Sequence, residues 1–221
     1  MERLSLLETL VAAAPALGRG LAMTVQLAVT VIPITLLTGI LAGIGMVYGG
    51  RILAALLRLY VDFIRGVPAL AIIFSVYYLL PLTGIAIAEY AAAVLALSVF
   101  FFAHVTETAR GAIQSVPRAQ VEAAKAIGLR PAQRLRYVIL PQALRRFLPP
   151  WINTVVETVK GTALLSLLGI VDLMLATQQI VGRTFEAMLF YTVTAAIYIA
   201  INFTLSWTSR ALERRFAYVT V

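Results

Sequence analysis

The chain has 221 residues, of which 61% are hydrophobic and only 13% are charged. Soluble domains carry about 25% charged residues, so this composition excludes an ordinary soluble domain and favours a membrane protein. The absence of cysteine excludes disulfides and thiolate metal sites. The formal net charge of +8 would suit a nucleic-acid-binding protein unless the positions of the basic residues indicate another role.

The N-terminal residues 1–19 differ from a signal peptide, because Glu2 and Glu8 stand where a basic region belongs and Pro15 interrupts the apolar run. We therefore predict a short interfacial helix here. The first long apolar stretch follows, and its Gly39 and Gly43 either form a small-residue face that lets another helix approach closely or are ordinary glycines of a membrane helix.

Uncharged stretches recur along the rest of the chain and predict membrane-spanning helices. Most exceed the roughly 18 apolar residues of a span, and the one at 90–106 is only slightly shorter. Another, at 147–171, is interrupted by Glu157 and Lys160. We predict an all-α membrane protein, a single domain over residues 1–221, with five spans at approximately 20–48, 66–84, 88–108, 147–176 and 187–209.

The basic residues fall mainly on one side of these five spans. If the chain begins outside, the inner segments hold 14 of the 18 Lys and Arg residues, the outer segments hold three, and Lys160 remains inside the membrane. The positive-inside rule then places the N-terminus outside and the C-terminus in the cytoplasm. Membrane topology thus accounts for the charge, and we expect no nucleic-acid partner.

Two pairs of opposite charges lie near the predicted membrane surface. Asp62 and Arg65 are three residues apart, as are Glu107 and Arg110, so each pair shares a helix face and favours a structural ion pair. His104 lies one turn before Glu107 and is more typical of a hydrogen-bonded core residue than of a proton relay.

The basic segment 117–141 predicts two short helices. Pro117 suits the first turn of one helix and Gly128 suits the left-handed position after its end, while Pro131 opens a second helix that Pro141 terminates or bends. The first helix carries small side chains suited to docking in a groove, with Glu122 and Lys125 at the rim. Alternatively, this basic helix rests on the inner leaflet.

The string EAAKAIGLRPAQRLRYVILPQA, from Glu122 onward, resembles the EAA signature of permease subunits of ATP-binding cassette importers. The strings RGVPAL, ETARGAIQSVP and VILPQALRRFLPPWIN resemble the permeases for polar amino acids, such as histidine and glutamine importers. The signature residues that match are Glu122, Ala123, Ala124, Gly128, Ile139 and Pro141.

This resemblance implies a subunit of the bacterial cytoplasmic membrane, surrounded by lipid, that pairs with a second, identical or homologous permease. It also implies an ATPase dimer and an extracytoplasmic amino-acid-binding protein as partners. Segment 117–141 would be the coupling element, with Glu122, Ala123, Ala124, Gly128 and Leu129 at the ATPase. The chain has no G-x-x-x-x-G-K-[ST] motif, so we expect no enzyme activity and no cofactor in it, ATP and magnesium being bound by the partner ATPase.

Glu157 and Lys160 are candidate substrate residues. An ionisable side chain at the centre of a membrane helix costs roughly 2.5–3.5 kcal/mol, so both need a compensating partner. They could meet the ammonium and carboxylate of an amino acid, with Gly161 and Thr162 beside them, or pair with each other and lock the span. The related permeases usually read D-T-S-L after the lysine, where this chain has Gly161 to Leu164.

Two other functions can be weighed against an ATP-driven importer. An ion-coupled secondary amino-acid transporter could also use buried charges, but such folds usually contain paired repeats, and five spans do not divide into two equal halves. A membrane-embedded enzyme would need convergent catalytic groups, which one histidine and scattered acids do not supply.

Overall fold

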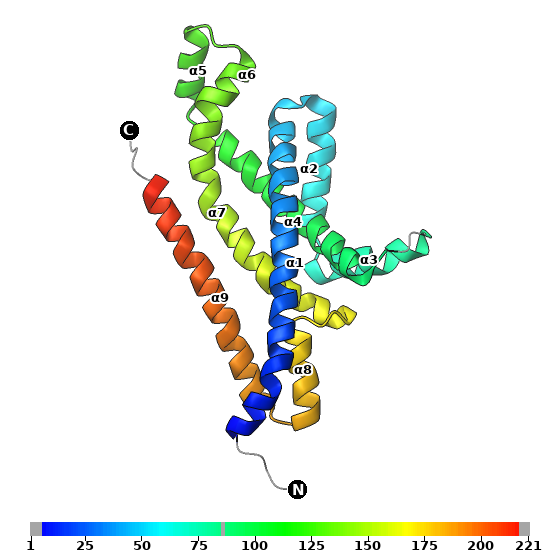
Figure 1. Ribbon diagram of the computed structural model, residues 1–221. Helices are drawn as coiled ribbons and strands as arrows, with labels where there is room; N and C mark the ends of the chain where they lie inside the picture. Colours follow the sequence, from blue (N-terminus) through cyan, green and yellow to red (C-terminus); the bar gives the residue numbers. More distant parts are fainter. Residues whose placement is uncertain (1–5, 85–86, 217–221) are drawn as a thin grey trace.

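The computed structural model describes residues 6–84 and 87–216, and every element in these ranges is helical (Figure 1), as the sequence predicted. Residues 1–5 of the expected interfacial helix and the expected cytoplasmic tail 217–221 lie outside them. The elements are α1 (Leu6–Tyr48), α2 (Gly50–Gly66), α3 (Ala69–Leu82), α4 (Glu89–Gln114), α5 (Arg118–Ala126), α6 (Pro131–Arg134), the π-helical turn η1 (Leu135–Ile139), α7 (Leu140–Gly161), the 3₁₀ helix η2 (Thr162–Leu168), α8 (Leu173–Thr184) and α9 (Ala187–Phe216).

Three continuous helices, α1, α4 and α9, are long and apolar enough to cross a membrane. Two further candidate spans are bent. Helices α2 and α3 meet at a bend of 110°. The helical segment from Pro131 to Leu168 meets α8 at a bend of 49°. Among the described residues, five spans are therefore reached only when each bent pair counts as one.

Helix α1 begins well before the predicted first span. We expected a separate interfacial helix up to Arg19, but one helix continues from Leu6 through Pro15 to Tyr48. A proline inside a helix removes one hydrogen bond, which packing can offset. Here Ala13 and Leu17 are buried against α8 and α9, so the N-terminal part of α1 belongs to the core.

The glycine face of α1 packs against α4. A Cβ atom added to Gly39 would lie 2.7 Å from the Cβ of Val105, and one added to Gly43 would lie 2.6 Å from the Cβ of Ala109. No real side chain tolerates such distances, so the two helices touch backbone to backbone at these positions. The predicted close approach is confirmed, and α4 is the helix that makes it.

Helix α2 differs from the predicted arrangement, in which residues 51–65 preceded a span at 66–84. The structure instead forms an amphipathic helix that runs back beside α1 (Figure 1) and buries Val61 and Ile64. Pro68 restricts Val67 to an extended conformation, and the chain turns there into α3. The basic residues of α2 are consequently distributed along the depth of the molecule.

Pro141 does not end the second helix of the coupling segment, although an end there was one of the two outcomes that we expected. Helix α6 continues through η1 into α7, and Pro141 lies in the first turn of α7. A π-helical turn contains one residue more than an α-helical turn and so makes room for a proline ring that would clash with the preceding turn. Helix α6 is thus continuous with α7 through η1.

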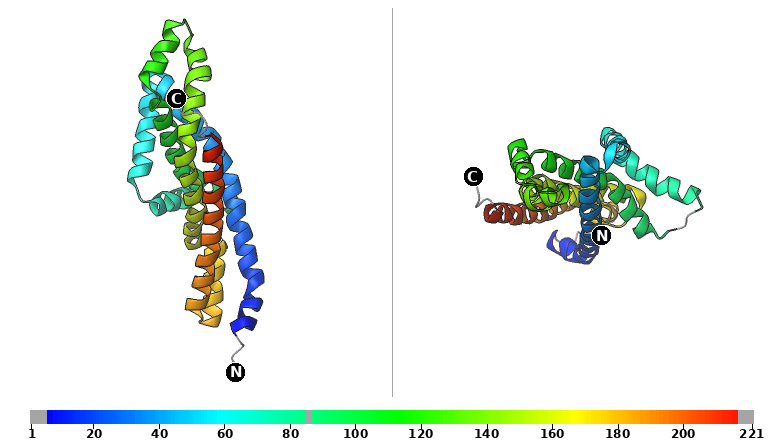
Figure 2. Two further views of the ribbon diagram at one scale, coloured as in Figure 1. Left: turned by 90° about the vertical axis from the view of Figure 1, so that its left-hand side faces the viewer. Right: turned by 90° about the horizontal axis from the view of Figure 1, so that it is seen from above.

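The predicted span over 147–176 is interrupted. Helix α7 ends at Gly161, η2 follows it, and α8 starts at Leu173 after a short irregular segment. The N-terminal end of α1 and the α5–α6 hairpin lie at opposite ends of the molecule, and α9 returns toward the hairpin end (Figures 1 and 2).

Candidate functional site

A cavity of about 140 Å³ lies where α3, α4, α7 and η2 meet. Its lining is apolar apart from one carboxylate, that of Glu157. The lining residues are Ala69, Ile73, Phe100, Phe101, Glu157, Gly161 and Leu164. A mostly apolar concave site with one convergent charge is the usual form of a small-molecule pocket.

Glu157 and Lys160 are both exposed, and neither forms an ion pair within the part of the chain that the structure describes. The internal lock that their spacing allowed is therefore not formed. Asn153, one turn earlier on the same face of α7, is exposed as well. These three residues form an exposed polar stripe along one face of α7, and we call it the α7 stripe.

Gly161 and Thr162 occupy different positions around the cavity. Gly161 lines it, and a Cβ atom there would lie 3.0 Å from the ring of Phe101, so the glycine keeps this corner open. Thr162 is fully buried, and its hydroxyl donates a hydrogen bond to the carbonyl of Val159 at 2.9 Å. Thr162 thus supports the start of η2 from behind the cavity wall.

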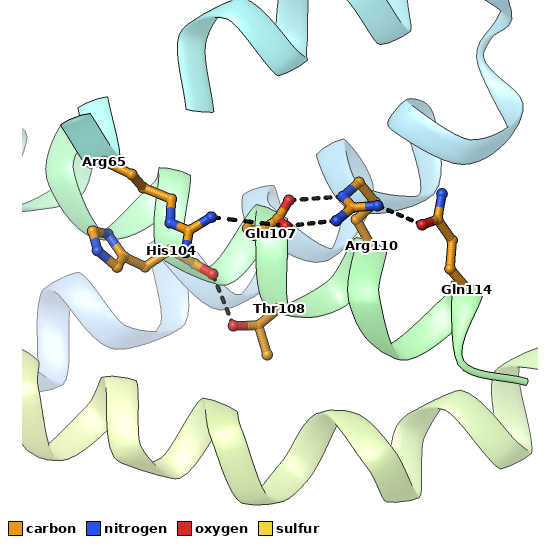
Figure 3. Close-up of polar contacts among 6 residues, drawn as sticks. All are labelled: Arg65, His104, Glu107, Thr108, Arg110 and Gln114. Carbon is orange, nitrogen blue, oxygen red and sulfur yellow. Dashed lines mark hydrogen bonds and ion pairs between the residues drawn. The ribbon is translucent and has the colours of Figure 1, made fainter. Parts of the chain in front are cut away.

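The charges on α2 and α4 pair across the two helices (Figure 3). Arg110 donates to both carboxylate oxygens of Glu107 at 2.6 and 2.7 Å, which confirms that predicted pair. Arg65 lies 3.7 Å from Glu107, whereas the pair that we expected between Arg65 and Asp62 does not occur among the described residues.

His104 has the predicted role of a hydrogen-bonded core residue, because its Nδ1 donates to the carbonyl of Phe100 at 3.1 Å.

Asp172 is a functional candidate that our sequence reasoning missed. Its side chain is fully buried and caps α8, accepting a hydrogen bond from the Leu175 N–H at 2.9 Å. The hydroxyl of Tyr198, on α9, lies 3.5 Å from the other oxygen. The Leu173 N–H donates to the Thr24 hydroxyl of α1 at 3.1 Å. An aspartate directly before an apolar helix is the usual N-cap signal, so the sequence did contain a clue.

The α5–α6 hairpin is closed by the turn that the sequence predicted. Gly128 has φ +81°, and the N–H groups of Gly128 and Leu129 donate to the carbonyls of Lys125 and Ala124 at 2.9 and 3.1 Å. This pair of bonds is a Schellman motif, which satisfies the last carbonyls of α5 and requires the left-handed glycine. Pro131 opens α6, also as predicted.

The exposed surface of α5 carries most of the candidate coupling residues. Glu122, Ala123 and Gly128 are exposed and Leu129 is half-buried, whereas Ala124 is buried inside the hairpin. Lys125 donates to Glu122 at 2.7 Å, and this hydrogen bond lowers the pKa of the Glu122 carboxyl below its usual value. The Glu122 carboxylate therefore keeps its charge at neutral pH, and the contact is lost as the pH falls through the lowered pKa.

Comparison with known families decides the class of the protein. The family model described as the binding-protein-dependent transport system inner membrane component matches residues 15–218. The chain belongs to this family. Among the relatives of this permease is the glutamine transport system permease protein of Escherichia coli K12, 34% identical over 205 residues, which are 92% of this chain and 94% of that protein. The probable glutamine ABC transporter permease protein of Bacillus subtilis 168 is 33% identical, with 89% and 91% of the two chains covered.

Solved structures agree with this assignment. The crystal structure of an amino acid ABC transporter with histidines contains a chain that is 31% identical, with a TM-score of 0.89, and the match covers 97% of this permease and 100% of that chain. A methionine ABC transporter in an inward-facing conformation has the same fold at 19% identity and a TM-score of 0.75, with 91% and 96% covered. The neighbours are importer subunits rather than ion-coupled transporters, so the ion-coupled alternative loses its support.

Proposed function

We propose that this permease forms the pathway for a polar amino acid in an ATP-driven importer. The observation that carries the proposal is the α7 stripe, in which Glu157 lines the cavity, Lys160 follows on the same face of α7, and neither forms an ion pair with another described residue. Charges at this depth cannot face lipid tails without a large free-energy cost, so they face water, substrate or a second permease. Relatives named for glutamine and other amino acids support the substrate class.

In this proposal the two charges recognise the two ends of a zwitterion. Glu157 accepts hydrogen bonds from the α-ammonium and Lys160 donates to the α-carboxylate, while Gly161 leaves room beside the Phe101 ring. Thr162 contributes indirectly by fixing the start of η2. Charge-assisted hydrogen bonds of this kind are stronger than neutral ones and discriminate against uncharged solutes.

The α5–α6 hairpin is the proposed coupling element. Its tip carries Glu122, Ala123, Gly128 and Leu129 to a cleft on an ATPase dimer, and the buried Ala124 keeps the two short helices close together. Closing of the ATPase dimer would move the hairpin and, through the helices attached to it, change access to the cavity.

Membership of the family supports the remaining parts of the proposal. The ATPase subunits bind ATP and magnesium and perform the hydrolysis, so this chain holds no cofactor and catalyses no reaction. An extracytoplasmic amino-acid-binding protein delivers the substrate, and a second, identical or homologous permease completes the pathway. The assembly lies in the bacterial cytoplasmic membrane, with the N-terminus outside and the hairpin in the cytoplasm, in keeping with the positive-inside distribution of basic residues.

Uptake into vesicles that contain the assembled importer tests this function. The rate of amino-acid uptake should depend on ATP supplied on the hairpin side and should not change when a proton or sodium gradient is imposed. Lys160→Met should reduce uptake about tenfold or more, the size expected for losing one charged contact, while the complex stays assembled. A variant that assembles and transports normally would remove Lys160 from the site, and uptake driven by an ion gradient would refute the function itself.

A further inference from the structure

A stripe of polar and small residues leads away from the cavity along α4. It starts beside Phe100, which lines the cavity, and continues at helical spacing through His104, Glu107, Gly111 and Gln114. His104 and Glu107 are half-buried, whereas Gly111 and Gln114, which come later in α4, are exposed. We call this stripe the α4 stripe.

Helix α2 carries three basic residues, of which Arg65 contacts the α4 stripe through Glu107. Arg51, Arg58 and Arg65 follow one another at intervals of seven residues, which is about two helical turns. Arg65 therefore lies about 21 Å along the helix from Arg51 and reaches the depth of Glu107. Ala69, four residues after Arg65, already lines the cavity. The two helices thus carry polar groups from the cavity toward the hairpin.

Glu107 is held unequally by its two cations. Arg110 binds it through two short hydrogen bonds and also donates to Gln114, so this arginine fixes the position and the charge of the carboxylate. Arg65 is only 3.7 Å away, and its side chain is 45% exposed. Arg65 can therefore exchange Glu107 for another carboxylate at little cost, because a long and half-exposed ion pair contributes little stability.

Half-exposed charges on the path between the cavity and the hairpin fit an aqueous surface better than lipid tails. We infer that the amino acid leaves the cavity along the α4 stripe and is held briefly between Arg65 and Glu107, with its carboxylate on the arginine and its ammonium on the glutamate. This second amino-acid position rests on the proposed import function, which it extends to the exit half of the pathway. Arg110 is then a positioning residue for Glu107.

Cysteine accessibility tests whether the stripe faces water, since the chain has no cysteine of its own. Gly111→Cys fits without a clash, because nothing lies within 4 Å of a Cβ atom there. In the assembled importer this cysteine should react with a charged, membrane-impermeant thiosulfonate supplied from the hairpin side. Leu41→Cys is the control, because Leu41 is exposed on α1 at nearly the same depth but lies on an apolar face. An unreactive Gly111→Cys would mean that lipid or a partner subunit covers the stripe, and the inference would fall.

Transport measurements test the second position itself. Arg65→Gln should reduce the maximal rate of uptake about tenfold while the half-saturating amino-acid concentration and the melting temperature of the complex stay unchanged. Arg65→Lys should recover most of the rate, and Arg183→Gln, an exposed arginine on α8, should have no effect. Normal uptake by Arg65→Gln, or a loss of uptake that follows a loss of thermal stability, would overturn the inference. If Arg65→Gln transports normally and Lys160→Met does not, the exit position fails and the proposed function stands.

Discussion

At the scale of single residues, Asp172 shows how one side chain holds an interrupted span together. Its carboxylate caps α8 and faces the hydroxyl of Tyr198, and the neighbouring Leu173 N–H is bound to Thr24. Three helices are therefore tied at the point where the main chain leaves η2. Free backbone N–H groups at a helix start are costly inside a membrane, since no water is present to satisfy them.

Replacing Asp172 should reveal whether its shape or its charge matters. Asp172→Leu removes the cap and leaves the Tyr198 hydroxyl without its acceptor, so we expect a loss of about 2 kcal/mol in stability, measured by thermal unfolding in detergent. Asp172→Asn preserves an oxygen acceptor and a good N-cap, and it should stay close to the unmodified protein. Equal damage from both variants would show that the negative charge, rather than the cap, is required.

At the scale of helices, the contact between α1 and α4 depends on the absence of side chains. Gly39 and Gly43 bring the two backbones together, and α4 then presents the face that carries Phe100 and Glu107 to the cavity and to α2. The positions of Phe100 and Glu107 thus depend on the glycine contact between α1 and α4, in which neither residue takes part.

Filling this contact should separate the helices. Gly43→Val places atoms where the Cβ of Ala109 already lies, and we expect a loss of about 1–3 kcal/mol in thermal stability, the usual cost of overpacking. Gly18→Ala is a matched control in the same helix, because nothing lies within 4 Å of its added Cβ atom. If Gly43→Val melted at the same temperature as the control, the close approach would not be needed for stability.

The sequence predicted the helices where local signals and packing agree. Gly128 and Pro131 marked the hairpin correctly, and the long apolar stretches gave α1, α4 and α9. Pro15 does not end a helix, because the buried contacts of Ala13 and Leu17 extend α1. Pro141 does not end one either, because a π-helical turn accommodates its ring. The cavity and the contact of Arg65 with Glu107 join residues far apart in the chain, which spacing along a helix cannot reveal.

At the scale of the whole molecule, both helices that leave the hairpin reach the cavity. Helix α4 runs from Phe100 and Phe101 at the cavity to the start of α5, and α7 runs from the end of the hairpin back to Glu157. The hairpin is therefore connected to two walls of one site. A displacement of the hairpin moves these walls together or apart, which is what alternating access requires of a coupling element.

Thiol labelling can test the proposed orientation. Leu82 at the end of α3 and Ile127 at the hairpin tip are both strongly exposed. In intact cells an impermeant reagent should label Leu82→Cys, while Ile127→Cys should react only after the membrane is permeabilised. Labelling of Ile127→Cys alone in intact cells would invert the topology.

The π-helical turn at Leu135–Ile139 also fixes a direction. A π-helical turn takes up one more residue in nearly the same rotation as an α-helical turn, so it makes room for the Pro141 ring while α6 stays in line with α7. Deleting one residue from this turn should press the Pro141 ring against the preceding turn and kink the helix there, so that the hairpin projects in another direction. Such a variant should insert in the membrane normally yet fail to copurify with the ATPase. A single residue, placed where Pro141 needs room, thus determines which way the permease points its contact surface.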